Sequence, residues 1–223
     1  MPSIFKMLAL LSVLLVAACG PGMQVPETAT AIVGTKAVIK VHRNELVAEV
    51  TDVTGRLVTT EFSNWAGEFL YNRTEYRGLI PVSGTEADGG QWELDFDERH
   101  LEAIFPLRPG KEVAFKGTLI DIERGTSFEM WGHIEVVGEK ILDLPTGKRK
   151  VVVLNFTREY SRKDKTKRQI DIIYYDPEYS MILKKVIRSQ GAQTYWRVVK
   201  VERPGKPGNT PTTRQRRSGT VMI

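Results

Sequence analysis

Apolar and polar residues alternate along three segments of the chain, without exception in the first. In residues 91–97 (QWELDFD), every apolar side chain is followed by a polar or acidic one. This period of two is that of a β-strand with one face in a core and the other in water. Residues 112–121 and 127–137 likewise place most of their large apolar side chains on one face, with a few interruptions of the alternation. The pattern therefore predicts three amphipathic strands.

Further short segments have the composition of strands, because they are rich in Val, Ile, Tyr, Phe and Thr and are separated by turn residues. They are residues 36–41, 45–53, 56–62, 75–82, 150–160, 167–176, 181–189 and 194–202. The connections are too short for crossover helices, so sequential strands should pair antiparallel. One helical turn is predicted over residues 98–104, with Asp97 as its N-cap. The sequence thus predicts an all-β, mostly antiparallel fold: one strongly curved sheet or partly closed barrel with at most one short helix.

The N-terminus has the layout of a secretory signal peptide. Lys6 precedes an apolar run, residues 7–18 (MLALLSVLLVAA), that contains no charged side chain. A helix that crosses the hydrocarbon core of a membrane needs ~20 apolar residues, so this run is too short to be a span. We expect export, removal of residues 1–18 and no transmembrane helix in the mature chain.

The only cysteine of the chain, Cys19, directly follows the triplet Val16-Ala17-Ala18. This order resembles the lipobox of bacterial lipoproteins, whose cysteine is acylated before cleavage. The resemblance implies that Cys19 becomes the first residue of the mature protein and holds it on a membrane through covalent lipid. Gly20 follows where aspartate would signal the inner membrane of Gram-negative bacteria. The resemblance therefore implies the outer membrane, facing the periplasm, or the plasma membrane in a Gram-positive source.

Two other roles for Cys19 have less support in the sequence. A buried free thiol would leave an exported chain with an odd cysteine and no disulfide partner. A nucleophilic thiolate needs a base partner, whereas Cys19 is followed by Gly20, Pro21 and Gly22. Lipidation explains the single cysteine better than either alternative.

Composition divides the rest of the chain into three parts. Residues 19–30 show no apolar period and are a predicted flexible tether, and residues 31–202 form a single predicted β domain. Residues 203–223 carry five basic side chains and no acidic one, which predicts a disordered basic tail. The whole chain has 32 Lys and Arg against 27 Asp and Glu. This small, dispersed excess does not indicate a nucleic-acid partner.

Only one group of side chains suggests a binding site. Trp131, His133 and Glu135 share the polar face of the predicted strand 127–137. A His-x-Glu pair occurs in zinc deaminases, but the Pro-Cys-x-x-Cys half of that motif is absent. We therefore regard the three residues as possible ligand contacts on an exposed strand face, and expect neither a metal site nor a cofactor.

The chain lacks the common catalytic motifs. It contains no G-x-S-x-G nucleophile elbow and no phosphate-binding glycine motif. Glu93, Asp95 and Asp97 could be compared with the paired carboxylates of glycosidases. Their alternation along one strand is that of a solvent face. We expect no enzymatic activity.

Three turns between residues 105 and 178 resemble those of uncharacterised periplasmic β-rich lipoproteins. They are residues 105–111 (FPLRPGK), 144–147 (LPTG) and 174–178 (YYDPE), each before a predicted strand. Ser180 stands where a glycine is usual after the third turn. The resemblance implies a β-rich envelope protein and supplies no catalytic residues.

Three classes of function remain compatible with these observations. The first is a lipid-anchored envelope protein that binds a partner protein or a glycan. The second is a carrier or chaperone for a hydrophobic ligand, such as a lipid, in a cavity of the curved sheet. The third, a hydrolytic enzyme, has the least support. An apolar concavity would favour the carrier, and a fully packed barrel would count against it.

Overall fold

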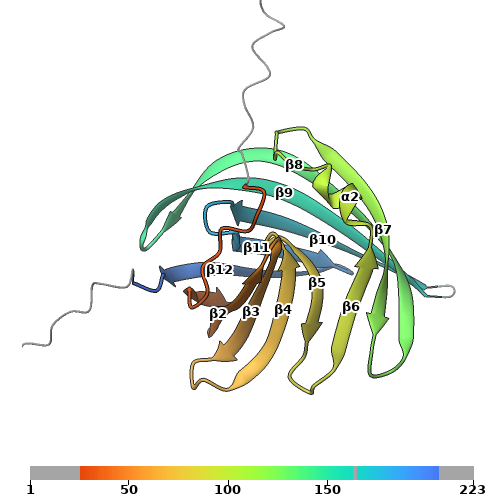
Figure 1. Cartoon of the computed structure of the whole chain (residues 1–223), viewed down its shortest axis with the longest axis horizontal. Helices are drawn as coiled ribbons and strands as arrows, with labels where there is room; N and C mark the ends of the chain where they lie inside the picture. The colour runs from red at the N-terminus through yellow and green to blue at the C-terminus, as the bar shows by residue number, and fades with distance from the viewer. Residues whose placement is uncertain (1–25, 163–164, 206–223) are drawn as a thin grey trace, which may run out of the picture.

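The computed structural model describes residues 26–162 and 165–205 (Figure 1). The short helix α2 (Glu98–Glu102) lies between the sixth and seventh of the strands. The strands are β1 (Lys36–Val41), β2 (Asn44–Thr54), β3 (Leu57–Asn64), β4 (Phe69–Tyr76), β5 (Ile80–Thr85), β6 (Gln91–Phe96), β7 (Glu112–Asp121), β8 (Thr126–Leu144), β9 (Gly147–Arg162), β10 (Lys165–Asp176), β11 (Met181–Ser189) and β12 (Ala192–Glu202).

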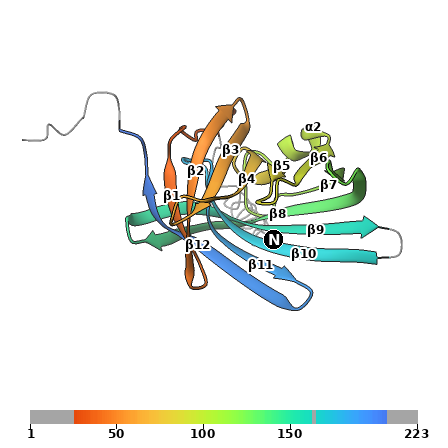
Figure 2. The same cartoon turned by 90° about the horizontal axis from the view of Figure 1, so that it is seen from below.

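Each strand pairs antiparallel with its neighbour in sequence, and β1 pairs with β12 to close a barrel. The predicted all-β, antiparallel fold is confirmed, and closure is complete because the first and last strands meet. A closed barrel leaves no strand edge unpaired. The longest strands, β8 and β9, arch over one side (Figure 1). In the turned view, β9 and β10 continue as a hairpin beyond their neighbours (Figure 2).

Shifts of pairing register provide the curvature that closure requires. The β8–β9 ladder shifts by one residue between Val136 and Gly138, and the β10–β11 ladder between Tyr174 and Tyr175. Similar shifts occur in the ladders β1–β12, β2–β3, β3–β4 and β4–β5. A β-bulge increases the local twist and bends the strand that carries it. Six of the twelve ladders therefore carry a bulge that helps to curve the sheet.

The barrel has two different ends. The helix end carries α2, the turns β2–β3, β4–β5, β8–β9 and β10–β11, and the N-terminal segment 26–35. This segment is attached to the turns by hydrogen bonds from the Ala29 amide to the Gly55 carbonyl (3.1 Å) and from the Thr30 amide to the Ser180 hydroxyl (2.8 Å). The hairpin end carries the remaining turns. The helix α2 and the N-terminal segment thus cover the helix end of the barrel, and the hairpin end has no such cover among the described residues.

The connection between β6 and β7 plugs the helix end. Asp97 caps α2 by accepting a hydrogen bond from the Arg99 amide (3.0 Å), as the sequence predicts, but the helix ends at Glu102. The side chains of Leu101, Ile104 and Leu107 are at most 1% exposed and join the main core. A connection rather than a strand therefore supplies much of the packing at this end.

The predicted strand 75–82 is wrong. This segment contains the end of β4, a tight turn and the start of β5. Arg77 and Gly78 have φ of 51° and 64°. A Cβ on Gly78 would lie 1.7 Å from the Ser180 carbonyl oxygen, so only glycine fits there. The turn could not be recognised from the pattern, because the residues before and after it are buried and the sequence from residue 79 onward is apolar.

Ser180 also has a left-handed backbone, with φ of 45°. This conformation favours glycine, the residue usual at this turn in the proteins that the sequence resembles. The serine contributes contacts that a glycine could not make: its hydroxyl accepts a hydrogen bond from the Thr30 amide and lies 2.9 Å from the Thr30 hydroxyl. The departure noted in the sequence thus fastens the N-terminal segment to the barrel.

Candidate functional site

The interior of the barrel is packed toward the helix end and hollow toward the hairpin end. In the packed half, Val136, Leu154, Ile173 and Tyr175 are at most 1% exposed. In the hollow half, charged and aromatic side chains line two cavities of about 230 and 200 Å³. The hollow half is therefore the candidate functional site.

A buried carboxylate organises the charges of this half. Asp171 of β10 is fully buried and forms an ion pair with Arg158 of β9. Its carboxylate also lies 3.0 Å from Lys185 Nζ of β11 and accepts a hydrogen bond from Gln169 Nε2 (2.8 Å). Phe156 and Ile187 are its neighbours across the two ladders. Three adjacent strands thus bring one acid and two cations together inside the barrel.

Burial acts on the pKa of both Asp171 and Lys185. Burial raises the pKa of Asp171, but the charges of Lys185 and Arg158 outweigh it and hold the pKa below its ordinary value. Burial lowers the pKa of Lys185, and the attraction of Asp171 only partly offsets this. Asp171 is therefore an anion that keeps two cations in place.

Arg73 of β4 lies across the barrel interior and lines both cavities. Its Nε is buried and, among the described residues, has no hydrogen-bond partner; the Nε of Arg158 is in the same state. The guanidinium carbon lies 4.9 Å from the centre of the Tyr71 ring. A buried cation without an acceptor is costly, because lost hydration is not replaced. Arg73 is thus an unsatisfied donor directed at empty space.

Glu75 is on the same face of β4 as Arg73 and lines the larger cavity with Lys185. Burial raises the pKa of Glu75, and the nearby charges of Lys185 and Arg73 offset the rise only in part. The carboxyl group therefore tends toward its neutral form. When Glu75 is neutral, the charged groups on the wall of the larger cavity are the two cations Arg73 and Lys185.

Apolar and aromatic side chains form most of the remaining wall of the larger cavity. Toward the hairpin end its lining changes from charged to apolar, because Tyr71 follows Arg73 and Ile187 follows Lys185 in that direction. The other apolar liners are Ala37, Ile39, Val41, Leu46, Ala48, Phe62, Met181, Ile182, Trp196 and Val198. The arrangement suits a molecule with one polar group and an apolar portion.

The residues predicted as ligand contacts lie together on the outer face of β8. Trp131 and His133 are stacked, with ring centres 5.8 Å apart and an interplanar angle of 3°. The His133 Nε2 lies 3.3 Å from Glu112 Oε2, and Glu135 accepts a hydrogen bond from Asn155 (3.1 Å). The three side chains thus interact with the barrel surface and lie outside both interior cavities. Cys19 falls outside the described residues.

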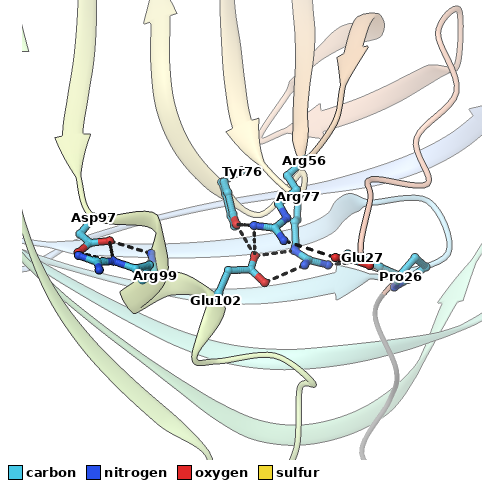
Figure 3. A network of polar contacts seen from close by, with 8 residues as sticks. All are labelled: Pro26, Glu27, Arg56, Tyr76, Arg77, Asp97, Arg99 and Glu102. Atoms are coloured by element: carbon cyan, nitrogen blue, oxygen red, sulfur yellow. Dashed lines mark hydrogen bonds and ion pairs between the residues drawn. The ribbon is translucent and has the colours of Figure 1, made fainter.

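A second polar network joins α2 to the helix end of the barrel (Figure 3). Glu102 accepts hydrogen bonds from Tyr76 and from Arg77 (2.9 and 3.1 Å) and lies 3.7 Å from Arg56. Arg77 is only 4% exposed and also donates to the Pro26 carbonyl. The network links α2, two turns and the N-terminal segment through paired donors and acceptors, so its role is to hold the plug and the N-terminal segment.

The sequence pattern did not predict the charged residues of the hollow half as site residues. Arg158 and Lys185 lie in correctly predicted strands, where single cations are typical of solvent-facing positions. Arg73 lies outside every predicted strand. One signal was present: Asp171 stands alone among isoleucines in the segment 170–173 (IDII). An isolated acid in an apolar strand requires a buried partner.

The described residues hold no group of three or more His, Cys, Asp or Glu side chains arranged to bind a metal ion. Among the helices of this part of the chain, none has the length and apolar character needed to cross a membrane.

Comparison with known proteins finds similarity of structure only. No protein-family model and no curated protein matches the sequence. The hypothetical lipoprotein YmcC from Escherichia coli matches with a TM-score of 0.50 at 7% identity, over 92% of this chain and 98% of that one. This chain shares its fold. The predicted resemblance to β-rich lipoproteins is thereby confirmed at the level of the fold.

Two further structures are similar. One, from Bacteroides fragilis, is described as an exported protein with a YmcC-like fold; it is 12% identical over 79% of this chain and 99% of that one, with a TM-score of 0.48. The other is described as a lipoprotein from Parabacteroides distasonis; it is 10% identical over 79% of this chain and 100% of that one, with a TM-score of 0.47.

Proposed function

We propose that the chain is a lipid-anchored protein of the cell envelope that binds a small, partly apolar ligand in the hollow half of its barrel. The observation that carries the proposal is the pair of cavities that meet at Arg73 in a barrel that is otherwise tightly packed. Protein interiors are normally filled to the density of organic crystals. Empty space lined by apolar groups and a few polar groups without partners is the usual form of a ligand site.

The anchor rests on the sequence. The apolar run that ends in Val-Ala-Ala before Cys19 resembles a lipobox, and Gly20 favours the outer membrane facing the periplasm. Acylation of Cys19 would hold the protein on the membrane surface essentially permanently. The fold shared with a protein described as a hypothetical lipoprotein agrees with this proposal.

The size of the site limits the ligand. The larger cavity, about 230 Å³, lies below the ~300–1,000 Å³ typical of sites that enclose a drug-sized molecule. A short apolar portion fits inside, and a longer one would extend past the hairpin end. A carrier or receptor for a small amphiphile therefore suits the barrel better than a carrier for a whole multi-chain lipid.

Filling the larger cavity tests this function. The Ala48 side chain is 3% exposed and lines the cavity, so Ala48→Leu places additional atoms in it. We expect Ala48→Leu to weaken the binding of brominated octanoate and brominated octanol about tenfold or more. Both probes can be detected because bromine quenches the fluorescence of Trp196 and Trp92, which line the cavities.

The assay uses the full, lipid-anchored chain in nanodiscs of uncharged lipid, with empty nanodiscs as the blank. Ala114→Leu, on the exposed outer face of β7, is the matched control and should bind as the unchanged protein does. Leu46→Trp provides a second way to narrow the cavity if Ala48→Leu fails to fold. Absence of quenching by both probes in the unchanged protein would refute the proposed function.

A second candidate function is recognition of a glycan or partner protein on the outside of the barrel. A shallow groove of about 650 Å³ runs over the outer faces of β3–β6 and is lined by amide, hydroxyl and acidic groups, which suit sugar hydroxyls. Its polar lining includes Thr59, Asn72, Thr74, Thr85 and Asp95. Binding of envelope glycan that survives Ala48→Leu would favour this candidate.

A further inference from the structure

The charges around the larger cavity identify the polar group of its ligand. We infer that Arg73 binds the carboxylate or phosphate head of an anionic amphiphile whose apolar portion points toward the hairpin end. The inference rests on the proposed function, because it assigns the chemistry of a ligand in the same cavity.

Arg73 has a buried donor without a partner among the described residues. Among the described residues its guanidinium has no ion pair and its Nε has no hydrogen-bond partner, and the guanidinium carbon lies 4.9 Å from the centre of the Tyr71 ring. Other buried cations of this barrel are paired: Lys185 and Arg158 with Asp171, and Arg77 with Glu102. A planar guanidinium fork matches carboxylate and phosphate oxygens in a bidentate geometry. Arg73 therefore lacks the kind of partner that an anionic ligand supplies.

The charged groups around the larger cavity also favour an anion. Asp171 neutralises only one of the two cations that it contacts, Arg158 and Lys185. The charged side chains that line the larger cavity are two cations, Arg73 and Lys185, and one acid, Glu75, whereas Arg158 lines only the smaller cavity, together with Glu86. The site thus keeps a positive excess even when Glu75 is ionised, and low polarity strengthens its attraction for an anion.

The larger cavity runs from charged side chains in the interior to apolar ones toward the hairpin end. Arg73 and Lys185 lie deeper than Tyr71 and Ile187, which are two residues nearer the hairpin end on the same strands. Phe62 stacks on Tyr71 at 4.4 Å between ring centres and continues the apolar wall. An amphiphile that places its head on Arg73 would therefore have its apolar portion against these rings.

Exposed aromatic side chains extend this path beyond the cavity. Trp65 is 70% exposed and Phe69 43% exposed, and both belong to the β3–β4 hairpin whose strands carry Phe62 and Tyr71. Large apolar groups in water are costly unless a partner covers them. The apolar portion of a ligand longer than the cavity would leave the barrel at this end. The smaller cavity, in contrast, is lined by the acidic Glu86 and suits an anion less well.

Substitution of Arg73 tests the inference in the same nanodisc assay. Arg73→Met should weaken octanoate binding about tenfold or more, because a charge-assisted hydrogen bond is lost. Binding of octanol, which has the same chain without the charge, should change little. Arg73→Lys keeps the charge and should retain most of the octanoate affinity. Inorganic phosphate, a head without a chain, should compete with octanoate only weakly.

The controls separate this inference from the proposed function. Arg197→Met removes a cation from the exposed outer face of β12 and should leave both affinities unchanged. Thermal unfolding should show that Arg73→Met folds at least as stably as the unchanged protein, because a buried Nε donor without an acceptor is removed. Equal affinity for octanoate and octanol, or an unaltered octanoate affinity in Arg73→Met, would overturn the inference and leave the proposed function standing. Binding of neither probe would overturn both.

Discussion

Asp171 and Glu75 are two acids inside the same barrel with opposite pKa directions. Asp171 contacts Arg158 and Lys185, and their charges hold its pKa below the ordinary value. Glu75 lies near Lys185 and Arg73 without a direct ion pair, and burial raises its pKa. The same interior therefore keeps one acid charged and favours the neutral form of the other.

Glu75 should make stability depend on pH. The groups whose charges act on or respond to it are Arg73 and Tyr71 of β4, Tyr175 of β10 and Lys185 of β11. Because its pKa is raised on folding, the folded state binds more protons above the ordinary glutamate pKa. The free energy of unfolding should then fall as pH rises from that ordinary value through the raised pKa.

Glu75→Gln should therefore be more stable than the unchanged protein at neutral pH. The gain is about 1.4 kcal/mol for each tenfold change in proton affinity, and it should vanish as pH falls below ~4. Thermal unfolding of both proteins across this pH range measures it. Glu93→Gln, on the exposed outer face of β6, serves as the control. A Glu75→Gln variant that is less stable at neutral pH would contradict the assignment.

The interior site was the least predictable part of the molecule. Binary patterning assigns charged residues to the solvent face of a strand. Arg158 and Lys185 break that rule because their partner, Asp171, comes from a third strand that only the closed barrel brings between them. Trp131, His133 and Glu135 were found because their spacing is local, which the sequence displays directly.

At the scale of elements, the connection between β6 and β7 decides how the helix end is closed. Leu101, Ile104 and Leu107 enter the core, and Glu102 ties α2 to the β2–β3 and β4–β5 turns through Arg56 and Arg77. Burial raises the pKa of Glu102, but hydrogen bonds from Tyr76 and Arg77 outweigh it and lower the pKa overall. The ionised form of Glu102 is thus the one that holds the plug.

Glu102→Gln should loosen this plug. Arg77 is 4% exposed and would lose its carboxylate partner, which we expect to lower the free energy of unfolding by about 1–3 kcal/mol. Hydrogen exchange of residues 98–111 should accelerate more than that of β8 and β9. Thermal unfolding and hydrogen exchange of the full chain measure the two effects.

Glu98→Gln is the matched control, since Glu98 belongs to the same helix and is exposed. It should cost no more than a few tenths of a kcal/mol. An equal effect of the two substitutions would mean that the network in Figure 3 does not hold α2 in place.

Most elements could be predicted from the sequence because their patterns are local. Strands such as β6 and β7 follow from alternation, and the N-cap at Asp97 follows from its side chain. The turn at Arg77 and Gly78 could not be predicted. A glycine is needed at position 78 because the Ser180 carbonyl, which is distant in the sequence, leaves no room for a Cβ atom. Complete closure through β1 and β12 depends likewise on a contact between the two ends of the domain.

At the scale of the whole molecule, the N-terminal segment relates the barrel to the membrane. Pro26, at the helix end, is seven residues after Cys19, and such a stretch spans at most about 25 Å. Under the proposed anchor, the helix end therefore stays near the membrane. The hairpin end, with Trp65 and Phe69, is then free to face away from it. The cavity would be open to the periplasm.

The central claim is that the barrel holds an anionic amphiphile. Native mass spectrometry of the full chain, extracted from its own membranes, tests it most directly. The covalent mass on Cys19 reports the anchor, and a ligand held without a covalent bond is released on collisional activation.

We predict a released molecule with a carboxylate or phosphate group and an apolar portion, present in the unchanged protein and in Arg197→Met and depleted in Arg73→Met and Ala48→Leu. A lipidated chain that is ligand-free in every preparation, or a ligand retained equally by all four proteins, would contradict the account.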